Sequence, residues 1–153
     1  AHADPAPLAK AIGRNDFDCV QFPLNAALSG ISLAGFKPPF PGERAYCFET
    51  VVLPVALQKN MGVLAMKVFV QGKLLGKGPA KADPETLLRY SLSLPVSAAV
   101  LGMSTPAIIA QDAAWARAFK PMTADERAEL SARLAPANKV AFDRFFAHHS
   151  DFC

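Results

Sequence analysis

The chain has 153 residues, 52% of them hydrophobic, and a formal net charge of +3 at pH 7, which allows a single domain over residues 1–153 with a buried core. The charge is mild and the lysines and arginines are scattered along the sequence, so a nucleic acid partner is not expected. Three cysteines without C-x-x-C spacing support neither a disulfide framework nor a zinc site, and a reducing compartment, the cytoplasm, is the expected location.

The N-terminal part predicts a helix followed by a strand. Asp4 followed by Pro5 is typical of a helix start, because the carboxylate can accept a hydrogen bond from an orphan backbone N–H and proline has no N–H to lose. Gly13 is expected to end this helix. The apolar run at 17–24, FDCVQFPL, predicts the first strand, and Cys19 within it is expected to be a small buried side chain.

Two long loops separate the next elements. Residues 25–44 are dense in glycine and proline and predict a loop, which a helix over 46–59 follows, with a kink at Pro54. A second strand is expected over 62–68. A second loop, 69–82, then leads to the next helix.

The stretch from 83 to 112 predicts a helix, a buried strand, a tight turn and a further helix. Asp83 with Pro84 repeats the helix-start pattern, and the strand over 95–102, PVSAAVLG, has no polar alternation, as expected where both faces are covered. Thr105 with Pro106 starts the next helix directly after the turn. The free N–H groups of that helix would attract an anion.

The C-terminal part predicts two more helices. Thr123 and Glu126 have the spacing of a capping box, which starts one helix, and residues 137–149 predict another. His148 and His149 are adjacent on the second helix, and adjacent residues do not face the same way. We therefore expect a solvated helix end there and no metal site.

The lengths of the links indicate where a ligand would bind. Expected links from helix to strand have only a few residues, whereas two of the links from strand to helix are long. In α/β barrels and doubly wound sheets, ligands bind at the carboxyl ends of the strands, where such insertions gather. Residues 90–111 carry no charge, but Pro95, Gly102 and Pro106 interrupt them, so no membrane span is predicted.

Several of these segments resemble the aldo/keto reductase family. LLRYSLSLPVSAAVLGM, followed by a helix ending in AWARAFKPMTADE, resembles its last helix, strand and helix, while DFDCVQFPLNAA and GVLAMKVFVQGKLL resemble its sixth and seventh strands. The resemblance implies an α/β fold, the C-terminal part of a TIM (β/α)8 barrel, with three parallel strands alternating with helices plus terminal helices. A full barrel takes about 250 residues, so the chain is expected to be part of a longer protein.

The resemblance also implies a site for a nicotinamide cofactor. Gln21 would contact the nicotinamide carboxamide, although a strand glutamine hydrogen-bonded inside the barrel is the structural alternative. Met66, beside Lys67, stands where the family usually stacks an aromatic ring on the nicotinamide, and Val68 begins the segment along the pyrophosphate. The adenosine end of the cofactor would be held by a turn and a helix: Gly102, Met103, Ser104, Thr105, Gln111 and Asp112.

Two departures bear on cofactor choice. NADP-preferring members of the family place a Lys at the position of Gly102 and an Arg at that of Ile108, cations that a 2′-phosphate needs. NADP is therefore expected on the resemblance alone, and NAD is the alternative. The family's catalytic Asp, Tyr, Lys and His belong to the first half of the barrel, so no catalytic residue is expected in this chain.

The resemblance implies an oxidoreductase that transfers a hydride between the cofactor and a small-molecule carbonyl or alcohol. This chain would supply the cofactor-binding part and be inactive alone. Two alternatives stay open. One is a non-catalytic nucleotide-binding module, and the other is a structural half-barrel that associates with a second copy through unpaired strand edges.

Overall fold

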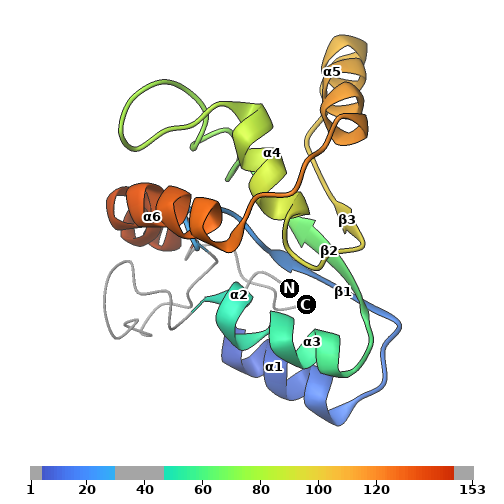
Figure 1. The fold of residues 1–153 in the computed structure, drawn as a ribbon. Helices are drawn as coiled ribbons and strands as arrows, with labels where there is room; N and C mark the ends of the chain where they lie inside the picture. The colour runs from blue at the N-terminus through green and yellow to red at the C-terminus, as the bar shows by residue number, and fades with distance from the viewer. Residues whose placement is uncertain (1–4, 30–46, 147–153) are drawn as a thin grey trace.

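The computed structural model describes residues 5–29 and 47–146, without the side chains at 139–140 and 142–146. Three strands and six helices alternate in this part of the chain (Figure 1). They are α1 (Pro5–Arg14), β1 (Cys19–Pro23), α2 (Phe48–Val51), α3 (Leu53–Gln58), β2 (Gly62–Met66), α4 (Pro84–Leu92), β3 (Ala98–Ala99), α5 (Pro106–Arg117) and α6 (Ala124–Phe146).

The three strands form one parallel sheet in the order β1-β2-β3. The register places Gln21 of β1 beside Leu64 of β2, and Leu64 beside Ala98 of β3. The predicted mixed α/β fold, with parallel strands alternating with helices, is confirmed. Strands that follow sequence order leave one outer edge on β1 and another on β3.

All three strands are shorter than predicted. Strand β1 covers Cys19–Pro23 instead of 17–24, β2 covers Gly62–Met66 instead of 62–68, and β3 covers only Ala98–Ala99 instead of 95–102. Strand β2 ends because Lys67 has a left-handed backbone, with φ 57°, which turns the chain out of the sheet. Strand β3 is an edge strand, so it forms a ladder only where β2 lies beside it.

The hydrophobic core lies on one face of the sheet. Phe22 of β1 is fully buried and stacks on Phe48 of α2, with ring centroids 5.8 Å apart, and Val63 and Ala65 of β2 belong to the same core cluster. Helices α1 to α4 and α6, together with the segments that connect the elements, contribute the other members of this cluster, including the fully buried Tyr90 of α4. Burying these apolar side chains together is the main force that holds the helices to the sheet.

The opposite face of the sheet is open. Cys19, Gln21 and Ala98 are exposed and Leu64 is half-buried, and these four residues alternate with the core-facing ones along their strands. The expectation that Cys19 is buried was therefore wrong, as was the expectation that both faces of the third strand are covered. An apolar run without alternation does not reveal on its own which face lacks a covering layer.

The helix starts follow the sequence pattern closely. Asp83 accepts a hydrogen bond from the backbone N–H of Thr86 at 2.9 Å, and Thr105 accepts one from Ile108 at 3.3 Å. Both caps are followed by proline, as predicted. Helix α1 continues through Arg14, one residue past the expected stop at Gly13.

The helix predicted over 46–59 is two short helices. Helix α2 ends at Val51 and α3 begins at Leu53, with Pro54 in the first turn of α3. Proline cannot donate an N–H to the preceding turn, so it favours a break just before it.

The C-terminal prediction of two helices was wrong, because α6 runs without interruption from Ala124 to Phe146 and contains Pro136. The predicted capping box is confirmed. The Thr123 backbone N–H donates to the Glu126 carboxylate at 2.6 Å, and the Glu126 N–H donates to the Thr123 hydroxyl at 3.1 Å. That hydrogen bond from Thr123, together with the nearby Arg89 guanidinium, lowers the pKa of Glu126.

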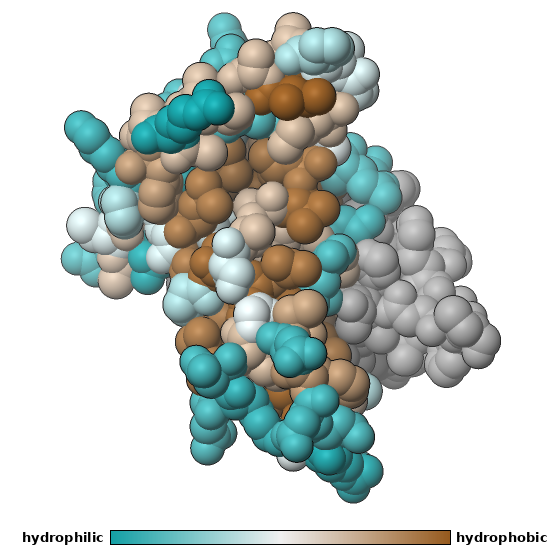
Figure 2. Space-filling view, turned by 90° about the vertical axis from the view of Figure 1, so that its right-hand side faces the viewer, coloured by the Kyte–Doolittle hydropathy of each residue, from teal (hydrophilic) through white to brown (hydrophobic). Residues whose placement is uncertain are grey.

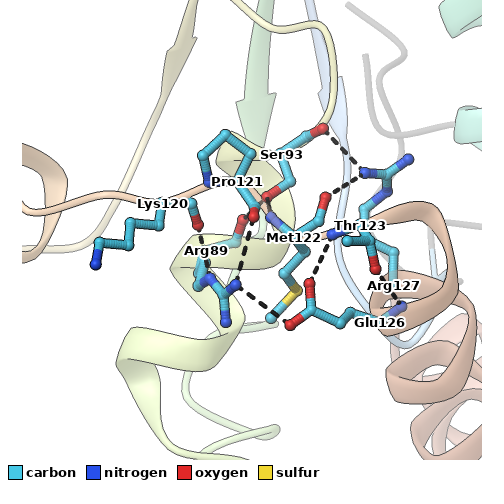
Figure 3. Close-up of polar contacts among 8 residues, drawn as sticks. All are labelled: Arg89, Ser93, Lys120, Pro121, Met122, Thr123, Glu126 and Arg127. Atoms are coloured by element: carbon cyan, nitrogen blue, oxygen red, sulfur yellow. Dashed lines mark hydrogen bonds and ion pairs between the residues drawn. The ribbon is translucent and has the colours of Figure 1, made fainter.

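A group of polar contacts ties α4 to the start of α6 (Figure 3). Arg89 of α4 donates to the backbone oxygen of Lys120 at 2.7 Å and pairs with Glu126 at 3.4 Å. Ser93 accepts from the Met122 N–H at 2.7 Å, and Arg127 donates to the backbone oxygen of Met122 at 3.0 Å. These contacts fix the segment that returns from α5 across the end of α4.

Helix α5 is the least covered of the described helices. In Figure 1 it projects from the rest of the molecule. Asp112 is its one buried residue, while Ile108 and Ile109 are 38% and 49% exposed. None of the described helices combines the length and apolarity that crossing a membrane requires.

Candidate functional site

A cavity of about 560 Å³ lies at the carboxyl ends of the strands. Gln21 of β1 and Met66 of β2 form part of its wall, and Val100, which follows β3, forms another part. The remaining lining residues come from the segments that follow β2 and β3: Lys67, Val68, Phe69, Gln71, Gly72, Leu75, Leu101 and Gly102. The cavity therefore occupies the position where α/β proteins commonly bind ligands.

Five of the residues predicted to bind a cofactor line this one cavity. They are Gln21, Met66, Lys67, Val68 and Gly102. They come from three separate segments of the sequence, so the parallel sheet is what brings them together.

Gln21 and Met66 are in direct contact. The side-chain amide of Gln21 donates to the Met66 sulfur at 3.3 Å. Gln21 is exposed while Met66 is almost fully buried, so the pair spans the cavity wall from its rim to its base. A thioether is a weak acceptor, so a ligand carbonyl or amide could replace it as the partner of the Gln21 amide.

The segment after β2 has an unusual backbone. Lys67, Val70 and Gln71 have φ angles of 57°, 49° and 54°, and Gly72 has 80°. Left-handed geometry is rare for a β-branched residue such as Val70, whose side chain is fully buried in the core. Burial of Val70 offsets the backbone strain and holds the loop in a fixed shape beside the cavity.

Among the described residues that line the cavity, Lys67 is the one that carries a charge. Lys73 and Lys81 lie in the same loop, where the Lys81 ammonium donates to the Lys73 backbone oxygen. None of the described lining residues is a carboxylate, so the charge that these residues contribute to the cavity is positive. The remaining wall is mainly apolar, with Phe69 as its aromatic member, and such a site suits a ligand with a flat apolar part and a negative charge.

The other predicted residues lie outside this lining. Met103 is 42% exposed, and Ser104 and Gln111 are also exposed. Thr105 is occupied as the cap of α5. These side chains follow the cavity along the chain, from Gly102 onto α5.

Asp112 differs in exposure from Gln111, with which it is predicted to form an adenine-binding pair. Gln111 is exposed, whereas Asp112 is 4% exposed and one of its carboxylate oxygens, Oδ2, has no hydrogen-bond partner within the part of the chain that the structure describes. Burial raises the pKa of Asp112. The two residues are adjacent on a helix and cannot face the same side, which spacing alone already indicates.

A second, smaller cavity of about 280 Å³ lies between α4 and the end of α5. Trp115 and Phe119 line it, together with Glu85 and Lys120. It shares no lining residue with the larger cavity, and Arg89 on its wall is already engaged in the contacts with Lys120 and Glu126. None of the sequence-predicted site residues lies in it.

In the described part of the chain, no three histidine, cysteine, aspartate or glutamate side chains lie together in a way that could hold a metal ion. The histidines and the acidic residue near the C-terminus, His148, His149 and Asp151, lie outside the described residues. Cys153 and most of the loop predicted at 25–44 also lie outside them.

Sequence reasoning missed most of the apolar wall of the cavity. Phe69, Leu75, Val100 and Leu101 line it, but their spacing gives no sign that they meet. The sequence places Gln71 and Gly72 only within a predicted loop. Glycine at position 72 is the one local indication that this loop contains a left-handed turn.

Comparison with known proteins gives no further guide. No protein-family model, no curated protein and no solved structure matches this chain.

Proposed function

We propose that this chain is the cofactor-binding C-terminal part of an aldo/keto reductase, an oxidoreductase with a TIM (β/α)8 barrel. In that function a nicotinamide cofactor, NADP or NAD, exchanges a hydride with a small-molecule carbonyl or alcohol. The observation that carries the proposal is the cavity at the strand ends, which gathers five of the predicted cofactor residues.

The proposal assigns a role to each part of the cavity. The amide of Gln21, now on the Met66 sulfur at 3.3 Å, would exchange that weak acceptor for the carboxamide of the nicotinamide. Met66 would cover one face of the ring, and Phe69 offers aromatic surface in the same wall. Lys67 would stabilise the negatively charged pyrophosphate.

The adenosine end would lie along the exposed residues from Gly102 to Thr105 and onto α5. The N-terminus of α5 lies on this path, and the positive end of its helix dipole would favour an anion, although Pro106 has no N–H and Thr105 already accepts from the Ile108 N–H. Gly102 and Ile108 supply no cation for a 2′-phosphate, so the chain itself gives no reason to prefer NADP over NAD. When bound, the cofactor supplies the hydride chemistry.

The order of the elements is compatible with a barrel. Parallel strands in sequence order, with their covering helices on one face and the other face open, are what a segment of a (β/α)8 barrel requires. The exposed face of Cys19, Gln21 and Ala98 would then line the closed barrel. Substrate selection would be the task of loops from the first half of the barrel, because a fold alone does not fix the substrate.

A binding titration tests the proposal. We expect the chain to bind NADPH or NADH, followed by fluorescence of the reduced nicotinamide, and Lys67→Ala to weaken binding about tenfold, the loss of one charge-assisted contact. Lys10→Ala, which removes an exposed lysine of α1, is the matched control and should bind like the wild type. Absence of binding of either cofactor at millimolar concentration would exclude the proposed site.

A further inference from the structure

We propose that the smaller cavity, of about 280 Å³ between α4 and the end of α5, binds a small aromatic zwitterion, such as a free aromatic amino acid. The proposal does not rest on the proposed cofactor site, with which this cavity shares no lining residue. Small-molecule sites commonly have volumes of about 300–1,000 Å³. The smaller cavity is close to the lower end of that range, so it suits a ligand with a single ring.

The wall of the smaller cavity offers apolar and aromatic surface. Leu88 and Leu92 of α4 contribute to it, as do Trp115 of α5 and Phe119, which follows α5. Trp115 and Phe119 are half-buried, so each leaves surface open to a ligand. Aromatic rings favour offset or edge-to-face contact with a further ring, and this contact adds to the effect of burying apolar area.

Arg89 holds its guanidinium in a fixed position on this wall (Figure 3). Its Nε donates to the backbone oxygen of Lys120 at 2.7 Å, and its Nη2 donates to the backbone oxygen of Pro121 and to the Glu126 carboxylate, each at 3.4 Å. Its third nitrogen, Nη1, makes no hydrogen bond to any residue that the structure describes. A guanidinium that is already positioned and still has free donors suits a carboxylate.

The wall carries charges of both signs. Besides Arg89, Lys120 adds a cation and Glu85 adds a carboxylate. Within the described residues, neither Glu85 nor Lys120 has an ion-pair partner. Figure 2, which views the molecule from the side of α5 and β3, shows hydrophilic and hydrophobic residues next to one another at the top, where α5 lies. A ligand with a ring, a carboxylate and an ammonium group therefore complements this wall better than a ligand with one charge.

The spacing of Glu85 and Arg89 fits a ligand whose two charges are close together. They are four residues apart on α4, a spacing that commonly gives an ion pair, yet Arg89 pairs with Glu126. The Cβ atoms of such residues lie about 5–6 Å apart. One small molecule can therefore place its ammonium group at Glu85 and its carboxylate at Arg89, with its ring against Trp115.

Fluorescence of Trp115 tests the proposal, because this is the single tryptophan of the chain and it lines the smaller cavity. We expect L-phenylalanine to change the fluorescence in a saturable manner at millimolar concentration. Phenethylamine lacks the carboxylate, phenylpropionate lacks the ammonium group and L-leucine lacks the ring, and each should bind about threefold more weakly or worse. No saturable change with L-phenylalanine, or equal affinity for any of the three analogues, would overturn the proposal.

Substitutions of the two unpaired charges test their roles. Glu85→Gln should weaken the binding of L-phenylalanine about threefold without weakening that of phenylpropionate, which has no ammonium group. Lys120→Ala should weaken both ligands. The matched control is Asp125→Asn, which removes an exposed carboxylate from the first turn of α6 and should bind L-phenylalanine like the wild type. An equal effect of Glu85→Gln on both ligands would contradict the role of Glu85.

Filling the cavity tests where the ligand lies without removing a charge. Ala118 is exposed and lines the smaller cavity, so Ala118→Phe should abolish binding at L-phenylalanine concentrations that saturate the wild type. Ala116→Phe adds the same ring at an exposed position of α5 outside the lining and should bind like the wild type. Equal affinities of the two variants would place the ligand elsewhere and overturn the proposal.

Discussion

Asp112 shows how one residue can oppose the stability of the element that carries it. It is the one buried residue of α5, whose Ile108 and Ile109 side chains are exposed, and its Oδ2 atom has no hydrogen-bond partner among the described residues. Burial without a partner disfavours the charged form, which is why the pKa of Asp112 is raised. The carboxylate is therefore expected to destabilise the folded chain at neutral pH.

This expectation has a definite pH dependence. Because the folded-state pKa of Asp112 lies above the unfolded value of 3.8, the folded state is relatively favoured below pH 3.8 and loses that advantage as pH rises through the folded-state pKa. We expect Asp112→Asn to unfold at higher urea concentration than the wild type at pH 7, with the difference vanishing below the unfolded pKa. Asp125→Asn, an exposed aspartate on α6, should show no such gain, and an Asp112→Asn variant less stable at pH 7 would contradict the assignment.

At the scale of elements, the caps illustrate what the sequence could predict. The starts of α4, α5 and α6 depend on residues three positions apart, so the pattern is complete within a short window of sequence. The extent of β3 and the open face at Cys19 depend on which distant segments lie beside them, and no local pattern contains that information. The same holds for the candidate site. The family resemblance predicted Gln21, Met66 and Gly102 as site residues, whereas no local pattern indicated that Phe69 and Val100 form part of the cavity wall.

The two caps should differ in their effect on stability, because their helices differ in packing. Helix α4 places Leu87 and Tyr90 in the core, whereas α5 is largely exposed. We expect Asp83→Ala to lower the free energy of unfolding by about 1 kcal/mol and Thr105→Ala to leave global unfolding nearly unchanged while increasing hydrogen exchange within α5.

The effect of Asp83 should also depend on pH. Partial burial acts to raise its pKa, but hydrogen bonds from Thr86 outweigh this and lower it from 3.8. The carboxylate therefore stabilises α4 above pH 3.8, and this contribution is lost as pH falls through the lower folded-state pKa. Urea unfolding at pH 7 measures the free energy of unfolding of Asp83→Ala and of Thr105→Ala. An equal decrease in both variants would contradict the difference in packing between α4 and α5.

At the scale of the whole molecule, an exposed sheet face and a nearly uncovered α5 occur together in the described part of the chain. Both features would be satisfied by further strands and helices on the open side. In the proposed reductase, the remaining strands and helices of the barrel would supply them. The cavity at the strand ends belongs to the described chain itself, because its described lining comes from β1, β2 and the segments that follow β2 and β3.

The most direct test of the central claim maps cofactor binding residue by residue. In a titration of the 15N-labelled chain with NADPH and, separately, NADH, followed by amide chemical shifts, we expect the largest changes at Gln21, from Met66 to Val68, and from Gly102 to Thr105. The amides of α1 and the outer surface of α3 should stay unchanged. Shifts confined to the smaller cavity around Trp115, or no shifts with either cofactor, would contradict the proposed nicotinamide site.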